Sequence, residues 1–425
     1  MKQQFRLFTL LTIFSALSGT ANAAPDAAVL AQVAKEKPAL LGSLQELVSI
    51  ESGSRDLEGL NRLANHIAAK LADLGGKVEL LDSNADVYRM EDTPDQLGKM
   101  VKATFTGKGK KKILMIAHMD TVYQPGQLAQ QPFRVEGDRA YGLGIADDKQ
   151  GIAVIMHTIS ALNALKYRDY GTLTVLINAD EEISSPGSRS LITKLGAEHD
   201  AVFSFEASRA ASDKLELATS GIASANLVVR GKASHAGAAP EQGINALYEM
   251  AHQVLQMRDL SDPATGIKVN WTLATAGMTR NVIPAGAKAS ADVRVLRVED
   301  YDKVEQQLRG RIQKQLLPDA KVELTFERRR PPLELSQATR DMANHAQTIY
   351  REMGKELIID TEAHGGGTDA AFAGMKTRSP VLERLGLQGF GAHTADAEYV
   401  LVSSIEPRLY LVTRLVMDIA QGKTK

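Results

Sequence analysis

Short apolar runs and amphipathic stretches alternate along the first half of the chain. Apolar residues recur at helical spacing over 38–49 and 60–74, and two glycines follow the second stretch as a helix stop. The later run 113–117 is apolar at every position, which is typical of a strand buried on both faces. The whole pattern predicts strands at 78–81, 101–105, 113–117, 173–179 and 201–205, and further helices at 149–165 and 188–195. We therefore expect an α/β fold with a mostly parallel mixed sheet and helices on both of its faces.

The order of predicted elements changes near residue 221. Strands at 223–229, 268–274, 287–295 and 321–327 and helices at 245–257 and 298–316 follow in the order β-α-β-β-α-β. This order is typical of a ferredoxin-like α+β unit. After two prolines at 331–332 the α/β pattern resumes, with a helix at 337–353, a strand at 381–385 and a helix at 404–420. We expect an inserted domain over 220–330 that interrupts a first domain made of 24–219 and 331–425.

The N-terminus has the pattern of a secretory signal peptide. Lys2 and Arg6 precede an apolar run over 7–17, and Ala-Asn-Ala at 21–23 is a small-residue cleavage site. A buried N-terminal helix is the alternative interpretation. The apolar run is too short to span a membrane, and no later segment approaches the length needed. We expect residues 1–23 to be removed and the mature protein to be periplasmic, without a membrane anchor.

Composition excludes several classes of partner and site. The formal net charge of -1 does not favour nucleic acid as a partner. The chain has no cysteine, so a disulfide framework and a thiolate nucleophile are both excluded. Any zinc ion would have to be bound by nitrogen and oxygen atoms alone.

A histidine and an aspartate stand two residues apart at the end of the strand predicted at 113–117. Residues two apart on a strand point to the same face, so His118 and Asp120 are expected side by side. A metal-bound imidazole needs a partner for its second nitrogen, and a carboxylate often fills this role. On its own the pair is more typical of a polar strand end than of a metal site.

Asp147 and Asp148 follow a glycine-containing loop and begin the helix predicted at 149–165. An aspartate here can be an ordinary helix N-cap. Two metal ions about 3.5–4 Å apart, however, need a bridging carboxylate, and a loop-held aspartate can provide one. One of the two acids can cap the helix while the other bridges.

Further carboxylates and a second histidine lie at other strand ends. Glu181 and Glu182 follow the strand at 173–179, Glu206 follows the strand at 201–205, and His393 lies in a glycine-rich loop. Adjacent acids repel one another unless positive charge compensates them. Because parallel strands deliver the residues at their carboxyl ends to one crevice, these groups form the ligand set of a two-metal hydrolase.

Five stretches of the chain resemble the di-zinc metallopeptidases, a family that includes aminoacylases and bacterial succinyl-diaminopimelate desuccinylases. They are HMDTV at 118–122, GIADDK at 144–149, DEE at 180–182, GKASHAG at 231–237 and GGTD at 366–369. The resemblance covers essentially the whole mature chain. Within the family it is strongest to the folate-cleaving glutamate carboxypeptidases. It implies a zinc-exopeptidase-like catalytic domain and an inserted domain that forms a homodimer or acts as a lid.

The resemblance also implies which residues hold two Zn²⁺ ions in each subunit. His118 and Glu206 would bind one ion, and Glu182 and His393 would bind the other. Asp147 would bridge the two, and the peptide bond between Asp147 and Asp148 would be cis.

Catalytic roles follow from the same resemblance. Glu181 would be the general base and later the general acid, and Asp120 would orient its neighbours. His235, in the inserted domain, would reach the partner's active site and polarise the scissile carbonyl. Without the resemblance, a histidine in this glycine-rich turn is more typical of a surface or capping residue.

Two carboxylates of a C-terminal glutamate call for arginine and lysine donors. Arg294 and Asn281 match positions that bind the substrate carboxylate, and Arg330 and Lys214 match positions associated with glutamate. Lys214 is equally typical of a solvated cation at a strand end. Residues 183–186, Ile-Ser-Ser-Pro, depart from the lysine- and glycine-containing turn of glutamate carboxypeptidases, and His364 precedes the triple glycine.

These observations predict an exported zinc exopeptidase that releases glutamate from folates or N-acyl-glutamates. An aminoacylase or dipeptidase with another side-chain preference is the alternative enzyme. A periplasmic binding protein that uses metal only structurally is the alternative outside enzymes, and an intact Glu181 argues against it.

Overall fold

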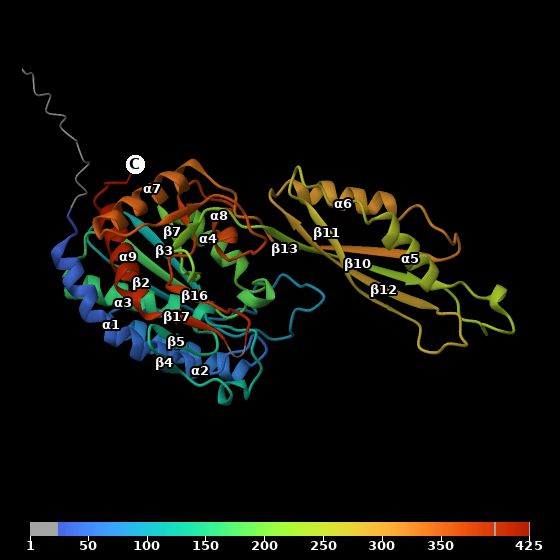
Figure 1. Cartoon of the computed structure of the whole chain (residues 1–425), viewed down its shortest axis with the longest axis horizontal. Coiled ribbons are helices and arrows are strands. Elements are labelled where there is room, and N and C mark those ends of the chain that lie inside the picture. Colours follow the sequence, from blue (N-terminus) through green and yellow to red (C-terminus); the bar gives the residue numbers. More distant parts are fainter. Residues whose placement is uncertain (1–23, 395–396, 425) are drawn as a thin grey trace, which may run out of the picture.

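A computed structural model describes residues 24–394 and 397–424, in which the chain forms a main unit and an inserted unit (Figure 1). The inserted unit spans residues 221–330 and has its own sheet and its own hydrophobic core. The predicted signal peptide lies outside the described residues. None of the helices in the described ranges is long and apolar enough to cross a membrane.

The main unit is built on a six-stranded sheet in the order β1-β2-β6-β3-β7-β15. Its strands are β1 (Lys77–Leu81), β2 (Met100–Thr106), β3 (Lys112–His118), β6 (Thr172–Asn178), β7 (Ala201–Ser204) and β15 (Val381–Leu382). The pairs β6–β3, β3–β7 and β7–β15 are parallel, whereas β1–β2 and β2–β6 are antiparallel. The prediction of a mostly parallel mixed sheet is therefore confirmed, and β3, β6 and β7 end at the same edge.

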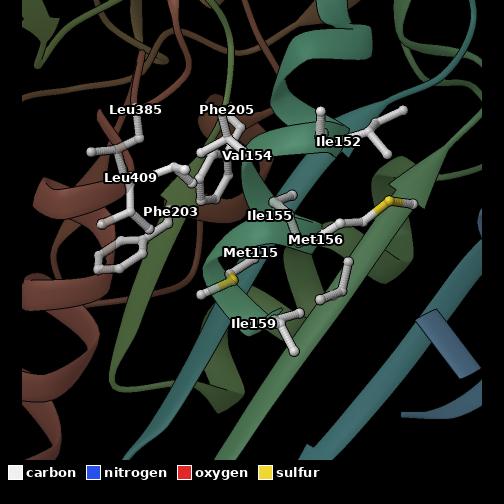
Figure 2. Packing of buried hydrophobic residues seen from close by; sticks show 14 of the residues in the cluster. Met115, Ile152, Val154, Ile155, Met156, Ile159, Phe203, Phe205, Leu385 and Leu409 are labelled. Carbon is white, nitrogen blue, oxygen red and sulfur yellow. The ribbon is translucent and has the colours of Figure 1, made fainter. Parts of the chain in front are cut away.

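Helices cover both faces of this sheet. They are α1 (Ala27–Val48), α2 (Leu57–Asp73), α3 (Gln150–Ala164), α4 (Arg189–Glu198), α7 (Gln337–Glu352), α8 (Ala370–Gly374) and α9 (Ile405–Ala420). The helices α1, α2, α3, α7 and α9 share one hydrophobic cluster, and α4 and α8 pack in a second cluster on the other face. Figure 2 shows Met115 of β3 and Phe203 of β7 packed with Ile155 of α3 and Leu409 of α9.

The first helix is longer than the periodicity predicted. It begins at Ala27, because the side chain of Asp26 accepts hydrogen bonds from the amides of Ala28 and Val29. The sequence-based start at residue 38 placed Pro38 in the first turn, where proline is favoured, but Pro38 lies inside the helix.

The inserted unit confirms the predicted β-α-β-β-α-β order. Its elements are β10 (Gly221–Arg230), α5 (Ala246–Gln256), β11 (Lys268–Ala276), β12 (Gly286–Val295), α6 (Asp300–Arg311) and β13 (Lys321–Arg330). The strands pair antiparallel in the order β11-β12-β10-β13, which is the ferredoxin-like arrangement. The helix predicted at 298–316 is shorter at both ends. The strands β10 and β13 connect this unit to the main unit (Figure 1).

Two small sheets were not predicted from the sequence. One contains β4 (Arg134–Glu136), β5 (Arg139–Tyr141), β17 (Tyr399–Leu401), β16 (Gln388–Phe390) and β8 (Ser208–Arg209), and the other pairs β9 (Lys214–Glu216) with β14 (Ile358–Asp360). Each strand is two or three residues long, which is too short to show a period of two. The sheet with β16 and β8 supplies one wall of the cleft described below.

Candidate metal centre

The five predicted metal ligands converge at the carboxyl edge of the main sheet. His118 ends β3, Glu182 lies in the short turn after β6, and Glu206 follows β7. Asp147 and His393 arrive from loops. Nitrogen and oxygen atoms of these residues form two groups, one of His118, Asp147 and Glu206 and one of Asp147, Glu182 and His393. Asp147 belongs to both groups.

The two oxygens of Asp147 face the two groups separately. Its Oδ1 lies 3.0 Å from His118 Nε2, which is also 3.5 Å from Glu206 Oε1. Its Oδ2 lies 3.2 Å from His393 Nε2, which is also 3.1 Å from Glu182 Oε2. One carboxylate thus stands between two clusters of donors, the arrangement that a bridging ligand requires.

Asp120 contacts the backbone that carries the two glutamates. Its Oδ1 accepts a hydrogen bond of 3.0 Å from the Glu181 amide, and its Oδ2 accepts one of 3.1 Å from the Glu182 amide. The hydroxyl of Ser54 donates to the same carboxylate at 2.8 Å. The backbone carbonyl of Asp120 lies 3.0 Å from His118 Nδ1 and can orient the imidazole.

Glu398 holds the loop that carries Asp147. This fully buried carboxylate accepts hydrogen bonds from the amides of Gly144, Ala146 and Asp147 at 2.9, 2.8 and 3.1 Å. Burial raises the pKa of Glu398 to about 7. The peptide bond between Asp147 and Asp148 is cis, as the resemblance implied.

The side chains of the centre carry more negative than positive charge, and this excess raises the pKa values of several of them. Burial, and then the negative charge of Asp147, raise the pKa of Glu182 to about 7. Hydrogen bonds to Asp147 and Glu182 raise the pKa of His393 to about 11. Burial opposes protonation of His118, but hydrogen bonds to neighbouring carboxylates outweigh it and raise this pKa as well.

The donor set fits a pair of divalent cations. In the part of the chain that the structure describes, the buried Oε1 of Glu182 has no hydrogen-bond partner, so it is available as a ligand. The site offers imidazole nitrogens and carboxylate oxygens and no thiolate, a set that suits zinc and related transition metals.

A cleft of about 960 Å³ opens beside these residues. Glu181 and the two predicted arginines, Arg294 and Arg330, line it. Arg330 is buried, contacts the Glu181 carboxylate and donates a 2.6 Å hydrogen bond to the Glu181 carbonyl. Arg294 donates to the carbonyl of Gly365 at 2.9 Å. Both predicted arginines therefore line the cleft, and both guanidinium groups already contact oxygen atoms of the chain.

Three other predicted residues lie outside this cleft in the chain. Lys214 pairs with Asp360 at 2.7 Å and with Glu216 at 3.1 Å. The loop after β10 and the loop before β12 lie at the end of the inserted unit that is remote from the main unit (Figure 1). The first loop contains His235 and the second contains Asn281, and the Ala236 amide donates to the Asn281 carbonyl. The imidazole of His235 is exposed.

A model of peptidase family M20/M25/M40 matches residues 114–418. The chain belongs to this family. It is 46% identical over 408 residues to carboxypeptidase G2 of Pseudomonas sp. (strain RS-16), with 96% of each chain covered. It is 26% identical over 338 residues to succinyl-diaminopimelate desuccinylase of Wolbachia pipientis, with 75% of this chain and 79% of the relative covered.

Solved structures share the fold. The M20 family metallo-carboxypeptidase Sso-CP2 of Sulfolobus solfataricus superposes with a TM-score of 0.70 at 17% identity, over 89% of this chain and 98% of that chain. The Bacillus subtilis YXEP protein, described as a dinuclear metal binding peptidase, gives a TM-score of 0.64 at 17% identity, over 91% and 99% of the two chains.

Sequence reasoning missed several residues that shape the site. Glu398 is one of two acids in the stretch 391–400, and nothing in that stretch distinguishes it from a surface acid. Arg384, in the loop after β15, and Phe390, in β16, line the cleft, and Arg384 pairs with Glu216 at 2.6 Å. Nothing in the sequence marked Phe390 as part of this wall, because the exposure of its side chain becomes known only from the structure.

Proposed function

We propose that the protein is a zinc-dependent carboxypeptidase that hydrolyses the amide bond to a C-terminal glutamate. Its substrates are N-acyl-glutamates and folates, and free glutamate is released. The observation that carries the proposal is the convergence of five donor side chains on two sides of Asp147, next to a cleft lined by two arginines. The 46% identity to carboxypeptidase G2 over nearly the full chain supports the choice of reaction.

The residues divide into two metal-holding groups that share one carboxylate. His118 and Glu206 would hold the first Zn²⁺, Glu182 and His393 would hold the second, and Asp147 would serve both ions. Bound there, the two ions would polarise the scissile carbonyl and lower the pKa of the attacking water.

Glu181 performs the proton transfers in this proposal. It lines the cleft beside Glu182, and its burial raises its pKa well above the ordinary value. A carboxylate with a raised pKa accepts a proton from the attacking water and returns it to the leaving nitrogen more readily near neutral pH. Asp120 keeps Glu181 in place through the backbone amide.

In this proposal the arginines of the cleft bind the glutamate part of the substrate. Arg294 and Arg330 offer forked donors that match carboxylates, and both lie at the junction with the inserted unit. Arg330 also pairs with Glu181, so a substrate carboxylate competes with Glu181 for the same guanidinium. Asn281 and Lys214 remain predicted substrate contacts, and each needs a rearrangement or a second subunit to reach the cleft.

The inserted unit supplies the dimer contact in the proposal. β11 is an edge strand, and Leu273 on it is 69% exposed. Pairing of two such edges would cover this apolar side chain and the unpaired backbone. A homodimer would also offer His235 to the partner's cleft, where an imidazole can stabilise charge on the carbonyl oxygen.

Export to the periplasm is part of the proposal and depends on residues 1–23 acting as a signal peptide.

The deciding experiment replaces the proposed base. Glu181→Gln should keep two zinc ions per subunit yet lower kcat for glutamate release from folate by at least about 1,000-fold, because general base catalysis contributes factors of this order. Metal analysis and a glutamate-release assay on the same preparation measure both quantities. Near-normal turnover of the variant would overturn the assignment of the base.

The same assay separates the proposal from its alternatives. A glutamate carboxypeptidase should prefer N-acyl-glutamate to N-acyl-leucine and should lose that preference in Arg330→Ala. An aminoacylase or dipeptidase would hydrolyse both substrates and keep its ratio in the variant. Stoichiometric zinc without any amidase activity would favour a binding protein.

A further inference from the structure

A strained turn follows the two glutamates of the candidate site. Glu181–Ile183 form a short 3-10 turn, and Ser184 and Ser185 come next with backbone φ angles of 70° and 52°. Residues other than glycine rarely adopt this left-handed conformation because the Cβ atom crowds the backbone. Surrounding contacts must therefore hold the turn in place.

Arg189 makes those contacts. Its guanidinium donates hydrogen bonds to the Ser184 carbonyl and to the Ser185 carbonyl, the latter at 3.2 Å. It also donates to the carbonyl of Arg329 at 2.7 Å, near the end of β13. One side chain thus joins the turn behind Glu181 and Glu182 to the strand that leads out of the inserted unit.

The guanidinium also lies over two aromatic rings. Its central carbon lies 4.2 Å from the ring centre of Tyr88 and 4.8 Å from that of Phe372. Planar stacking of this kind suits arginine and not lysine. Burial lowers the pKa of Arg189 to about 10, so the side chain stays positively charged at neutral pH.

The link continues to the carboxylate of Glu181. Arg330 is the next residue after Arg329 in β13, and it contacts the Glu181 carboxylate and donates to the Glu181 carbonyl. Arg330 therefore contacts the start of the segment 181–185, and Arg189 contacts its end. Through these contacts both ends of the segment are joined to the end of β13. None of the three hydrogen bonds of Arg189 goes to a metal ligand, and one acceptor, the carbonyl of Ser184, belongs to a residue that lines the cleft.

We propose that Arg189 is a positioning residue for Glu181 and Glu182. By joining the Ser184–Ser185 turn to the end of β13, it keeps the side chains of Glu181 and Glu182 in their positions at the cleft. This inference rests on the proposed function, since it assigns Arg189 to that reaction. It also explains how this chain accommodates two serines where a glycine would carry less strain.

A cavity of about 670 Å³ makes the proposal testable by chemical rescue. Arg189, Tyr88 and Phe372 all line this cavity, so a small cation can reach the space that a truncated side chain leaves. Arg189→Ala should lower kcat by about 10- to 100-fold, because displacing catalytic groups by about 1 Å costs this much. Guanidinium ion, at concentrations well below those that unfold proteins, should restore at least part of kcat in this variant.

Two further variants serve as controls. Arg189→Lys keeps the charge but cannot stack flat or bond several carbonyls, so its kcat should stay low. Arg328→Ala removes another guanidinium that lines the same cavity but pairs with Asp302 and Glu305, and its kcat should match the wild type with or without guanidinium. A purely structural role for Arg189 would lower the unfolding temperature and leave kcat of the folded fraction unchanged.

A second readout does not depend on activity. In metal-free protein, the amides of Ser184 and Ser185 donate to the carbonyls of Glu181 and Asp180 at 2.8 and 2.7 Å and should exchange slowly with solvent deuterium. Arg189→Ala should speed exchange in the peptide containing 180–187, and guanidinium should slow it again. Unchanged exchange would overturn the inference. Absence of glutamate release by the wild type would instead overturn the proposed function and leave the exchange result to decide the role of Arg189.

Discussion

The carboxylates of the candidate metal centre have different roles. Asp147 turns its two oxygens to two donor groups, whereas Asp120 and Glu398 accept hydrogen bonds from backbone amides. The first two were predicted because each directly follows a strand or a glycine-containing loop. Glu398 was not, because its partners lie some 250 residues away in sequence and only the fold brings them together.

Glu383 is a buried acid whose ionisation should lower stability. Its side chain is fully buried, and burial and then the negative charge of Glu206 raise its pKa from 4.5 to about 8. Between these two values the folded state keeps a proton that the unfolded state has lost. Stability should therefore fall as the pH rises through this window. Above it, the full cost of a buried carboxylate is present.

Glu383→Gln removes that cost. In metal-free protein, the variant should gain more than about 1 kcal/mol in unfolding free energy over the wild type near pH 9, and much less near pH 5. Urea unfolding at the two pH values measures the difference. A gain that is the same at both would show that Glu383 does not titrate in this range.

At the scale of elements, the long strands were predictable and the short ones were not. β3, β6 and β7 are mostly apolar and buried, and their common edge follows from their parallel pairing. The strands β5, β16 and β17 have three residues each and owe their existence to pairing with one another. The acyl side of the cleft, which depends on these strands, was accordingly invisible in the sequence.

These short strands bring three aromatic rings side by side, and one of the three lines the cleft. Phe390 of β16 lies 5.7 Å from Tyr399 of β17, which lies 5.5 Å from Tyr141 of β5, measured between ring centres. Phe390 is 58% exposed. It is the one Phe, Tyr or Trp side chain among the described residues that line the cleft. A flat acyl group can stack on it.

Phe390→Ala should reduce the preference for aromatic acyl groups. The ratio of kcat/KM for N-benzoylglutamate to that for N-acetylglutamate should fall about threefold to tenfold, the range expected for one aromatic pair. Phe390→Tyr keeps the ring and should keep the ratio. Val135→Ala truncates another exposed apolar side chain of the same sheet, outside the cleft lining, and should also keep it. A ratio unchanged in Phe390→Ala would remove Phe390 from the acyl subsite.

For the whole molecule, the order of helices and strands was predictable. The distance of each residue of the inserted unit from the cleft was not. The insertion of a β-α-β-β-α-β unit followed from the change of pattern near residue 221, and the fold confirms it. Arg294 and Arg330 lie near the junction between the units and reach the cleft. His235 and Asn281 lie at the remote end, because β10 and β12 carry their loops away from the main sheet. Periodicity alone does not reveal which end of an inserted sheet faces a site.

If His235 acts in the partner's cleft, two inactive variants should complement each other. Glu181→Gln subunits lack the base but still donate His235, and His235→Ala subunits keep the base but donate nothing. A heterodimer of the two would contain one complete site out of two, so its glutamate release should reach about half of the wild-type value per dimer. Differently tagged subunits, coexpressed and purified through both tags, allow this measurement, with the two variant homodimers as controls. A heterodimer as inactive as both homodimers would place His235 in its own subunit's cleft, because only exchange between subunits can assemble an intact site from this pair. An active His235→Ala homodimer would instead place His235 outside the reaction.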